Sequence, residues 1–295
     1  MATASQQPVD LHEPRSWRRT KNRIATVLMM LAFLFAMIPL GFVLYTVIAK
    51  GASIISWKFL TSDIPFNVAP ASEGGMGPAV LGTILITGLA TVIAVPIGVL
   101  AAIYVNEYGG NRVLTRVTRF MADVMTGVPS IVMGLFIFSI WVIHFGYSGL
   151  AGAFALGCLM LPVIIRSSEE MLKLVPDALR EASYALGASK ARVTLTVVLP
   201  AALSGIVSGS LLAVARAAGE TAPLLFCILT VTAANPNVFH GANTALPTQI
   251  FANASSVYPG AQARGWGAAL TLVAIAFILM IIARVATARA SRHAR

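Results

Sequence analysis

Long apolar runs without charged side chains divide the chain into segments. Three such runs cover residues 24–49, 76–105 and 265–283, and two more lie between residues 124 and 165, where the run is broken at 144–149. A helix needs about 20 residues to cross the hydrocarbon core of a bilayer. Because these runs are continuous and do not alternate with polar residues, they indicate helices and not the strands of a barrel. The pattern predicts an all-α, polytopic membrane protein.

Residues 199–233 form a sixth apolar stretch that is interrupted by Arg216 and Glu220. Its 35 residues fit either one long crossing or two short ones. Lys and Arg outside the runs number five in 1–23, two in 50–75, three in 106–119, five in 166–198, one in 234–264 and four in 284–295. One crossing places 17 of these on one side and three on the other, as the positive-inside rule requires.

The charge distribution therefore predicts six transmembrane helices with both termini in the cytoplasm. Residues 1–23 and 284–295 become cytoplasmic tails, and residues 24–283 become the transmembrane domain. With a single crossing over residues 199–233, Arg216 and Glu220 are expected to be buried at membrane depth.

Composition agrees with this topology and narrows the function. A mean hydropathy of +0.82 with 11% charged residues is typical of membrane proteins and not of soluble domains. The net charge of +10 resides in cytoplasmic segments, so topology explains it and no nucleic-acid partner is expected. The sequence has no phosphate loop and no CxxC or HExxH motif, and its four histidines are scattered. We expect no catalytic residues, bound cofactor or metal. Transport driven by a partner, transport driven by an ion gradient, and a structural or signalling role in the membrane remain open.

The longest cytoplasmic loop, residues 166–200, predicts two short helices. Pro176 and Asp177 suit a helix start and Gly187 suits a helix end, while Ser189 can cap a second helix that continues to the membrane. The surface is rich in Ala and Ser, so another protein can approach the backbone closely. A solvated helical hairpin with no partner is the alternative.

The same loop carries a spaced motif of small and charged residues. Its members are Glu181, Ala182, Ser183, Gly187, Val197, Leu199 and Pro200. Their spacing resembles the EAA loop of ABC importer permeases, with Ser183 and Val197 as the mild departures. In that family the loop sits in a cleft of a cytoplasmic ATPase. The resemblance implies a type I, MetI-like permease fold, with ATP and Mg²⁺ held by separate ATPase subunits.

Further segments narrow the resemblance. TGVPSIVMGLF (126–136), LPVIIRSSEEMLKLVPDALREASYALGASK (161–190) and ARAAGETAPLLF (215–226) resemble the PstA-type permeases of phosphate-specific ABC importers. The ending GETAPLLF favours PstA over the paired PstC permease. The family implies that this chain lies in a bacterial inner membrane as a heterodimer with a PstC-like permease. Two PstB-like ATPase subunits lie on the cytoplasmic side, and a periplasmic or lipid-anchored PstS-like phosphate-binding protein lies on the outer side.

Two other functions stay open from the residues alone. One is a permease of the same superfamily for another oxyanion, such as sulfate or molybdate. The other is an ion-coupled secondary carrier, which is expected to show inverted repeats and broken helices in matching halves. No such repeat is visible in the sequence.

Arg216 and Glu220 are the strongest candidates for a substrate path. Ionised side chains at membrane depth are costly and are tolerated only when they face a bundle interior or a water-filled path. The spacing places the two on one helix face, so a purely structural pair is the alternative. An arginine fork suits phosphate oxygens, and a nearby carboxylate keeps the net charge low and accepts from a protonated phosphate oxygen, or pairs with a basic residue of the PstC-like partner. Thr221 and Ser130 are weaker candidates for the lining.

Two more features bear on packing and docking. Gly205 and Gly209, extended by Ala201, predict a small-residue face for close helix packing in the membrane. The outward loops 50–75 and 234–264 hold few charges and many Asn, Ser, Pro and Gly residues, which suits either a docking surface for a binding protein or plain connectors.

Overall fold

The computed structural model describes residues 15–293, which contain helices and no strand. The chain divides into two compact units, residues 1–49 and 50–295. The described part of the first unit belongs to helix α1, Arg15–Gly51, up to the boundary. Its apolar side chains are exposed along most of its length, as expected for a helix whose surface meets lipid or another membrane helix.

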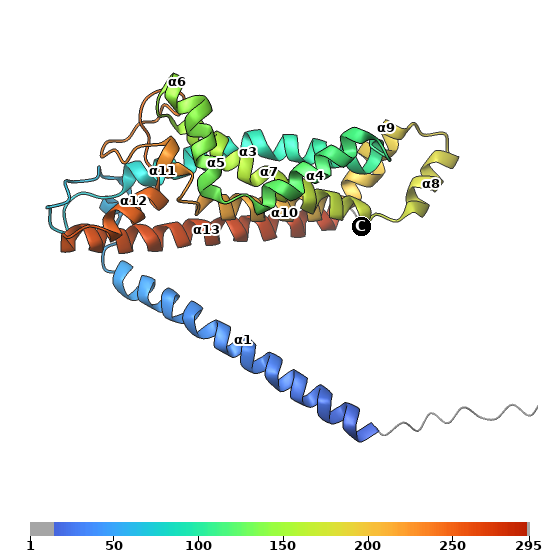
Figure 1. Ribbon diagram of the computed structural model, residues 1–295, viewed down its shortest axis with the longest axis horizontal. Helices are drawn as coiled ribbons and strands as arrows, with labels where there is room; N and C mark the ends of the chain where they lie inside the picture. The colour runs from blue at the N-terminus through green and yellow to red at the C-terminus, as the bar shows by residue number, and fades with distance from the viewer. Residues whose placement is uncertain (1–14, 294–295) are drawn as a thin grey trace, which may run out of the picture. The chain divides into compact units, whose positions relative to one another are not determined.

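Four long helices form the body of the second unit (Figure 1). They are α3 (Gly77–Ile103), α7 (Gly149–Lys173), α10 (Leu199–Ala218) and α13 (Pro259–His293). α7 packs against α3 and α10, and α10 packs against α13. Alanines from α3, α7 and α10, such as Ala94, Ala155 and Ala213, are buried in the shared core. Small side chains let the backbones approach closely, which is how helices associate in a membrane.

The predicted glycine face is confirmed for Gly205 and Gly209. A Cβ atom at Gly205 would collide with the side chain of Met171, and one at Gly209 with Ser167, and both of these neighbours lie on α7. Ala201 lies four residues before Gly205 on the same face of α10 and is exposed in the single chain.

The crossing before α7 is broken. Helix α4 (Val113–Gly127) is followed by α5 (Ser130–Ile137), a π-helical turn η2 (Phe138–Val142) and the short helix α6 (Ile143–Phe145). The two parts meet at an angle of 108°. Pro129 explains the break, because the residue before a proline is driven out of the helical region, and Val128 has a ψ of 126°.

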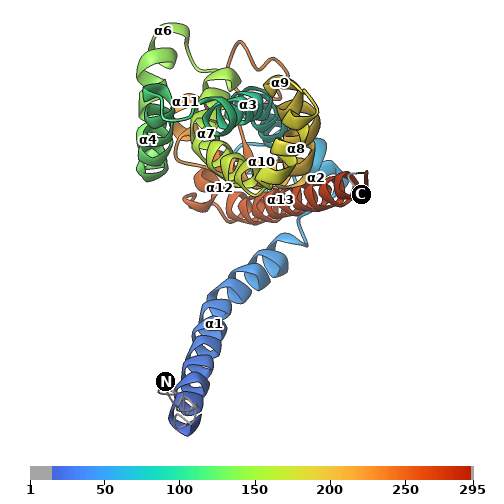
Figure 2. The ribbon, with the colours of Figure 1, turned by 90° about the vertical axis from the view of Figure 1, so that its right-hand side faces the viewer.

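The predicted number of crossings agrees with the described helices. Five of them are long and apolar enough to span a membrane, and the bent pair makes up to six. Helix α3 runs from one end of the second unit to the other, and α4 to α6 return. Helices α7, α10 and α13 then make three further passes in alternating directions (Figure 1). Figure 2 shows the same helices along the long axis, with α7 between α4 and α10.

The single helix expected over residues 199–233 is wrong at both ends. The apolar stretch begins earlier, at Lys190, and runs through α9 (Lys190–Val193), the π-helical turn η3 (Thr194–Val198) and α10 to Ala218. Gly219 is the C-cap, and Pro223 precedes a single turn, α11 (Leu224–Cys227). The segment still provides one crossing, so successive loops still lie on opposite sides of the membrane.

The two expected outward loops lie at the same end of the second unit. They carry the short helices α2 (Trp57–Thr61) and α12 (Leu246–Ala254). Arg264, near the start of α13, is fully buried, and its guanidinium donates to the carbonyls of Ala69 (3.0 Å), Pro70 (2.9 Å) and Phe66 (3.3 Å). This arginine therefore fixes the first outward loop to the start of α13.

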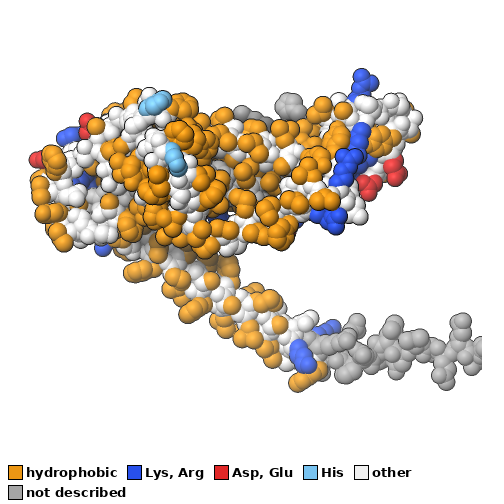
Figure 3. All heavy atoms as spheres, turned by 45° about the horizontal axis from the view of Figure 1, so that its top comes forward, with side chains coloured by type: hydrophobic (Ala, Val, Ile, Leu, Met, Phe, Trp, Pro, Cys, Tyr) orange, Lys and Arg blue, Asp and Glu red, His pale blue; other side chains and the backbone are white. Residues whose placement is uncertain are grey.

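Charged side chains gather at the opposite end, where α8 (Asp177–Ala185) and α9 form a helical hairpin. Figure 3 shows Lys, Arg, Asp and Glu side chains there and a largely apolar surface along the adjoining helices. This is the side that the count of basic residues assigns to the cytoplasm.

Candidate functional site

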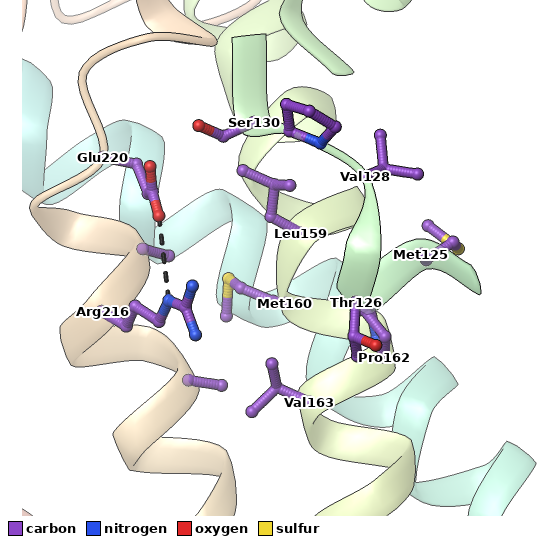
Figure 4. Close-up of a pocket in the computed structure, with 13 residues that line it drawn as sticks. Met125, Thr126, Val128, Ser130, Leu159, Met160, Pro162, Val163, Arg216 and Glu220 are labelled. Atoms are coloured by element: carbon purple, nitrogen blue, oxygen red, sulfur yellow. Dashed lines mark ion pairs between the residues drawn. The ribbon is translucent and has the colours of Figure 1, made fainter. Parts of the chain in front are cut away.

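A pocket of about 270 Å³ lies between the bend of α4 and α5, the middle of α7 and the end of α10. Val128, Pro129 and Ser130 come from the bend. Met160 and Val163 come from α7 (Figure 4). Arg216 and Glu220 form the wall contributed by α10 and the turn that follows it. The pocket thus brings together three of the four side chains that the sequence suggested for a substrate path.

Arg216 stands in the last turn of α10, with its side chain 74% exposed toward the pocket. The expectation that it is buried is wrong for this single chain. A cation at this position is stabilised by the negative end of the helix dipole. Its exposed guanidinium leaves several N–H donors facing the pocket.

Glu220 does not lie on the helix, contrary to the expectation of a shared helix face. Gly219 ends α10, and the following turn brings the Glu220 carboxylate back over the arginine. Oε1 of Glu220 lies 3.8 Å from Nε of Arg216, which is an ion pair but too long for a hydrogen bond. Glu220 lowers the local positive charge without occupying the donors of Arg216.

Ser130 lies across the pocket from the arginine, at the first residue of α5. The first N–H groups of a helix have no partner within the helix and favour anions. The Ser130 hydroxyl adds a donor and an acceptor on the same side. Thr221 does not line the pocket; it is half-buried in the turn before α11, where its carbonyl accepts from the Leu225 N–H.

Sequence reasoning missed an ionic network close to this pocket. Glu169 on α7 is 1% exposed, and its Oε1 is 2.8 Å from Nε of Arg119 and 2.7 Å from Nζ of Lys173. Arg166, one turn after Val163, pairs with Asp123 on α4. The network ties α4 to α7 on the cytoplasmic side of the pocket.

The network was missed because the sequence predicted the end of this membrane helix too early. The sequence places residue 166 at the start of a cytoplasmic loop because the apolar run ends at 165, whereas α7 continues to Lys173. The signal that remained in the sequence is the spacing of Arg166, Glu169 and Lys173, which puts all three on one helix face.

The helical hairpin expected in the cytoplasmic loop is confirmed. α8 begins directly after Pro176, Gly187 adopts a φ of +79°, and the Ser189 side chain accepts from the Arg192 N–H at the start of α9. Glu181 and Ala182 are exposed on α8, and the Ser183 hydroxyl donates to the Leu179 carbonyl at 2.8 Å. Leu186, the C-cap of α8, is 89% exposed.

The last two motif residues belong to the membrane helix. Leu199 is partly buried and Pro200 is exposed, both in the first turn of α10. The wide turn η3 directly before them suits a proline, which lacks an N–H and crowds the carbonyl of the previous helical turn.

Comparison with known proteins identifies the family. Residues 94–292 match the family described as "Binding-protein-dependent transport system inner membrane component". The chain is 43% identical over 281 residues to "Phosphate transport system permease protein PstA 1" of Mycobacterium tuberculosis (strain ATCC 25618 / H37Rv), covering 94% of this chain and 91% of the relative. It is 42% identical over 281 residues to the PstA protein of Yersinia pestis, covering 93% of this chain and 92% of the relative.

The chain belongs to the PstA family of membrane permeases. The resemblance seen in the GETAPLLF and EAA segments is thereby confirmed. This PstA-family permease is a transport component and a multi-pass protein of the bacterial inner membrane.

Solved structures show the fold. The chain resembles a permease of the inward-facing MetNI methionine ABC transporter, with a TM-score of 0.53 at 21% identity over 75% of this chain and 94% of that chain. It also resembles a subunit of a bacterial alginate ABC importer, with a TM-score of 0.61 at 13% identity over 93% of this chain and 99% of that chain. The PstA-family permease therefore has the expected MetI-like fold.

Proposed function

We propose that this permease forms part of an ATP-driven importer and moves inorganic phosphate into the cytoplasm past Arg216, Glu220 and Ser130. The observation that carries the proposal is the exposure of the Arg216 guanidinium and its distance from Glu220. This guanidinium is exposed in the pocket between the bend of α4 and α5, α7 and the end of α10, and the Glu220 carboxylate stands 3.8 Å away without a hydrogen bond. The names of the relatives point to phosphate as the substrate.

The chemistry of the three side chains suits a tetrahedral oxyanion. The planar guanidinium donates to two phosphate oxygens at once. Ser130 and the start of α5 provide donors on the opposite wall. Glu220 prevents the site from holding the anion too strongly, because it lowers the net positive charge beside the bound phosphate.

Glu220 also favours phosphate over sulfate. Phosphate keeps at least one proton near neutral pH, so its O–H can donate to the carboxylate. Sulfate is fully ionised and places only acceptor oxygens against the same carboxylate, which is unfavourable. A pocket with both Arg216 and Glu220 on one wall therefore selects a protonated oxyanion.

The partners of this permease follow from the same proposal. A PstC-like permease completes the path on the side where Arg216 is exposed. Two PstB-like ATPase subunits bind ATP and Mg²⁺ and dock on the exposed surface of α8, and this chain itself binds no cofactor. A periplasmic or lipid-anchored PstS-like protein delivers phosphate at the end formed by the loops of residues 50–75 and 234–264. Lipid surrounds the remaining helices, and no nucleic acid takes part.

Reconstitution tests the proposed function directly. The purified complex of this chain with its permease and ATPase partners is placed in liposomes with the phosphate-binding protein. Phosphate is expected to stimulate ATP hydrolysis and to accumulate at the cytoplasmic face, while sulfate and molybdate do neither. Equal stimulation by sulfate contradicts phosphate as the substrate, and ion-gradient-driven uptake without ATP contradicts the importer class.

A further inference from the structure

Helix α8 is attached to the membrane helices by few contacts. It contains no fully buried residue. Among the described residues, every side-chain hydrogen bond or ion pair that joins α8 to α7 or to the end of α3 comes from Arg180. The position of α8 relative to the bundle therefore depends strongly on one side chain.

The Arg180 guanidinium is held by four acceptors. Nη2 donates to Oε1 of Glu107 at 3.1 Å and to the Leu172 carbonyl at 2.9 Å. Nη1 donates to the Val175 carbonyl at 2.5 Å and to Oδ1 of Asp177 at 3.0 Å. The side chain of Arg180 is 14% exposed and that of Glu107 is 5% exposed. Such a planar fork with fixed donors holds its partners in one geometry, which a lysine cannot do.

Glu107 connects this arginine to α3. It lies in η1 (Tyr104–Tyr108), a π-helical turn that continues α3 at its cytoplasmic end. Asn106 donates to the same Oε1 of Glu107 at 2.8 Å, which fixes the carboxylate. π-helical turns within helices occur frequently at functional sites. Leu172 belongs to α7, so Arg180 joins α8 to two membrane helices at once.

Helix α7 lines the pocket, and α3 is connected to the pocket through its packing on α7. α3 packs along α7, and α7 provides Met160 and Val163 to the wall opposite Arg216. A displacement of α8 that carries Arg180 with it acts on the ends of both helices. Packed helices respond to such a displacement as rigid elements with discrete arrangements.

We propose that Arg180 is the positioning residue that transmits the movement of α8 to α3 and α7, through its bonds to Glu107 and the Leu172 carbonyl. This inference rests on the proposed function as an ATP-driven importer. Arg180 lies directly before Glu181, but it points toward the bundle, whereas Glu181 and Ala182 are exposed on the surface where a partner docks. Transmission and docking are thus assigned to different side chains of one short helix.

The experiment uses the complete complex in liposomes, and it measures the ratio of phosphate-stimulated to basal ATP hydrolysis together with the phosphate moved per ATP. Three variants are compared with wild type. Arg180→Gln removes the fork, Glu107→Ala removes the acceptor on the α3 side without changing α8, and Glu107→Gln keeps an oxygen that accepts from Nη2. Arg116→Gln is the matched control, since Arg116 is exposed at the cytoplasmic end of α4 and lies outside the coupling loop.

We expect Arg180→Gln and Glu107→Ala to lower the stimulation ratio about tenfold, a typical size for coupling between distant sites. Both variants retain the ATPase subunits during purification, and Glu107→Gln and Arg116→Gln keep the wild-type ratio. A wild-type ratio in Glu107→Ala overturns the proposal. Loss of the ATPase from Arg180→Gln also overturns it, because Arg180 then serves docking. If neither Arg180→Gln nor Glu107→Ala is found in the membrane, the Arg180–Glu107 pair is needed for folding only, and the proposal is also overturned. Failure of the proposed function is distinct, since wild type itself then shows no stimulation by phosphate.

Discussion

Oε1 of Glu220 lies 3.8 Å from Nε of Arg216, although Gly219 ends the helix between the two residues. A continuous helix would also place these two side chains on one face, because they are four residues apart. The break after Ala218 keeps them close but at a distance too long for a hydrogen bond. Glu220 is therefore close enough to lower the net positive charge of the pocket, while the N–H donors of Arg216 remain available to an anion.

Replacement of Arg216 tests the path. Arg216→Gln is expected to lower phosphate uptake about 10- to 100-fold, because charge-assisted hydrogen bonds contribute about 1.5–3 kcal/mol. Arg216→Lys keeps the charge but loses the fork, so it recovers only part of the uptake. Uptake of labelled phosphate is measured after membrane abundance and complex assembly have been checked. Normal uptake with Gln, or lost assembly with both variants, contradicts a role in the path.

Replacement of Glu220 tests selectivity. Glu220→Gln removes the carboxylate that repels a fully ionised oxyanion, so sulfate is expected to compete with phosphate more strongly than in wild type. Inhibition of phosphate uptake by sulfate is the measurement, with Thr221→Val as a control outside the pocket. An unchanged ratio of phosphate to sulfate affinity assigns Glu220 to structure only.

Replacement of Gly187 tests the turn between α8 and α9 in the cytoplasmic loop. Its φ of +79° lies in the left-handed region, and no atom stands within 4 Å of where a Cβ would be, so backbone strain is the only obstacle to a side chain. Gly187→Val is expected to cost about 1–3 kcal/mol locally and to uncouple ATP hydrolysis from uptake with normal membrane abundance. Gly187→Asn is the matched control, because asparagine tolerates this region. Equal transport in both variants, with intact stimulation of the ATPase, removes Gly187 from the coupling mechanism.

The sidedness of the chain is measurable with reporter tags. Tags at Met1 and Arg295 are expected in the cytoplasm, and tags near Ser62 and Gly241 outside, as the distribution of Lys and Arg requires. Compartment-specific reporters distinguish these positions. An outside C-terminus requires a second crossing after Ala218 and removes Arg216 from membrane depth.

Two glycines of α3 provide a matched test of packing. A Cβ at Gly82 would collide with the Thr244 carbonyl, whereas one at Gly88 meets no atom within 4 Å. Gly82→Ala is expected to destabilise the protein by about 1–3 kcal/mol, since a backbone atom cannot move aside easily. Gly88→Ala is neutral or slightly stabilising. Thermal unfolding of the detergent-purified complex gives both values, and equal midpoints contradict the close contact between α3 and the outward loop.

Local signals explain which parts of the fold the sequence could predict. Pro176, Gly187 and Ser189 define the helical hairpin, and each acts through its own backbone geometry or a bond three residues away. Apolar runs likewise locate the crossings, because the bilayer sets their length.

The end of α10 could not be found in this way. The segment 219–233 is apolar in part because Leu224, Cys227 and Ile228 are buried in the core, and hydropathy does not distinguish a buried turn from a continued helix. Gly219 and Pro223 carried the available signal. The network around Glu169 was hidden for another reason: it joins Arg119 to a residue 50 positions later, and such pairs follow from packing and not from spacing.

The buried bonds of Arg264 have a consequence for association at the outward end. Loop residues 66–70 are ordered by a guanidinium from their own chain, so their conformational entropy is lost when the protein folds. A protein that docks on this loop finds it preorganised and loses less entropy on binding. Recognition at this end therefore depends on the loop conformation that Arg264 holds. Loss of the Arg264 hydrogen bonds would make the loop more flexible and weaken docking, although no residue at the contact itself is changed.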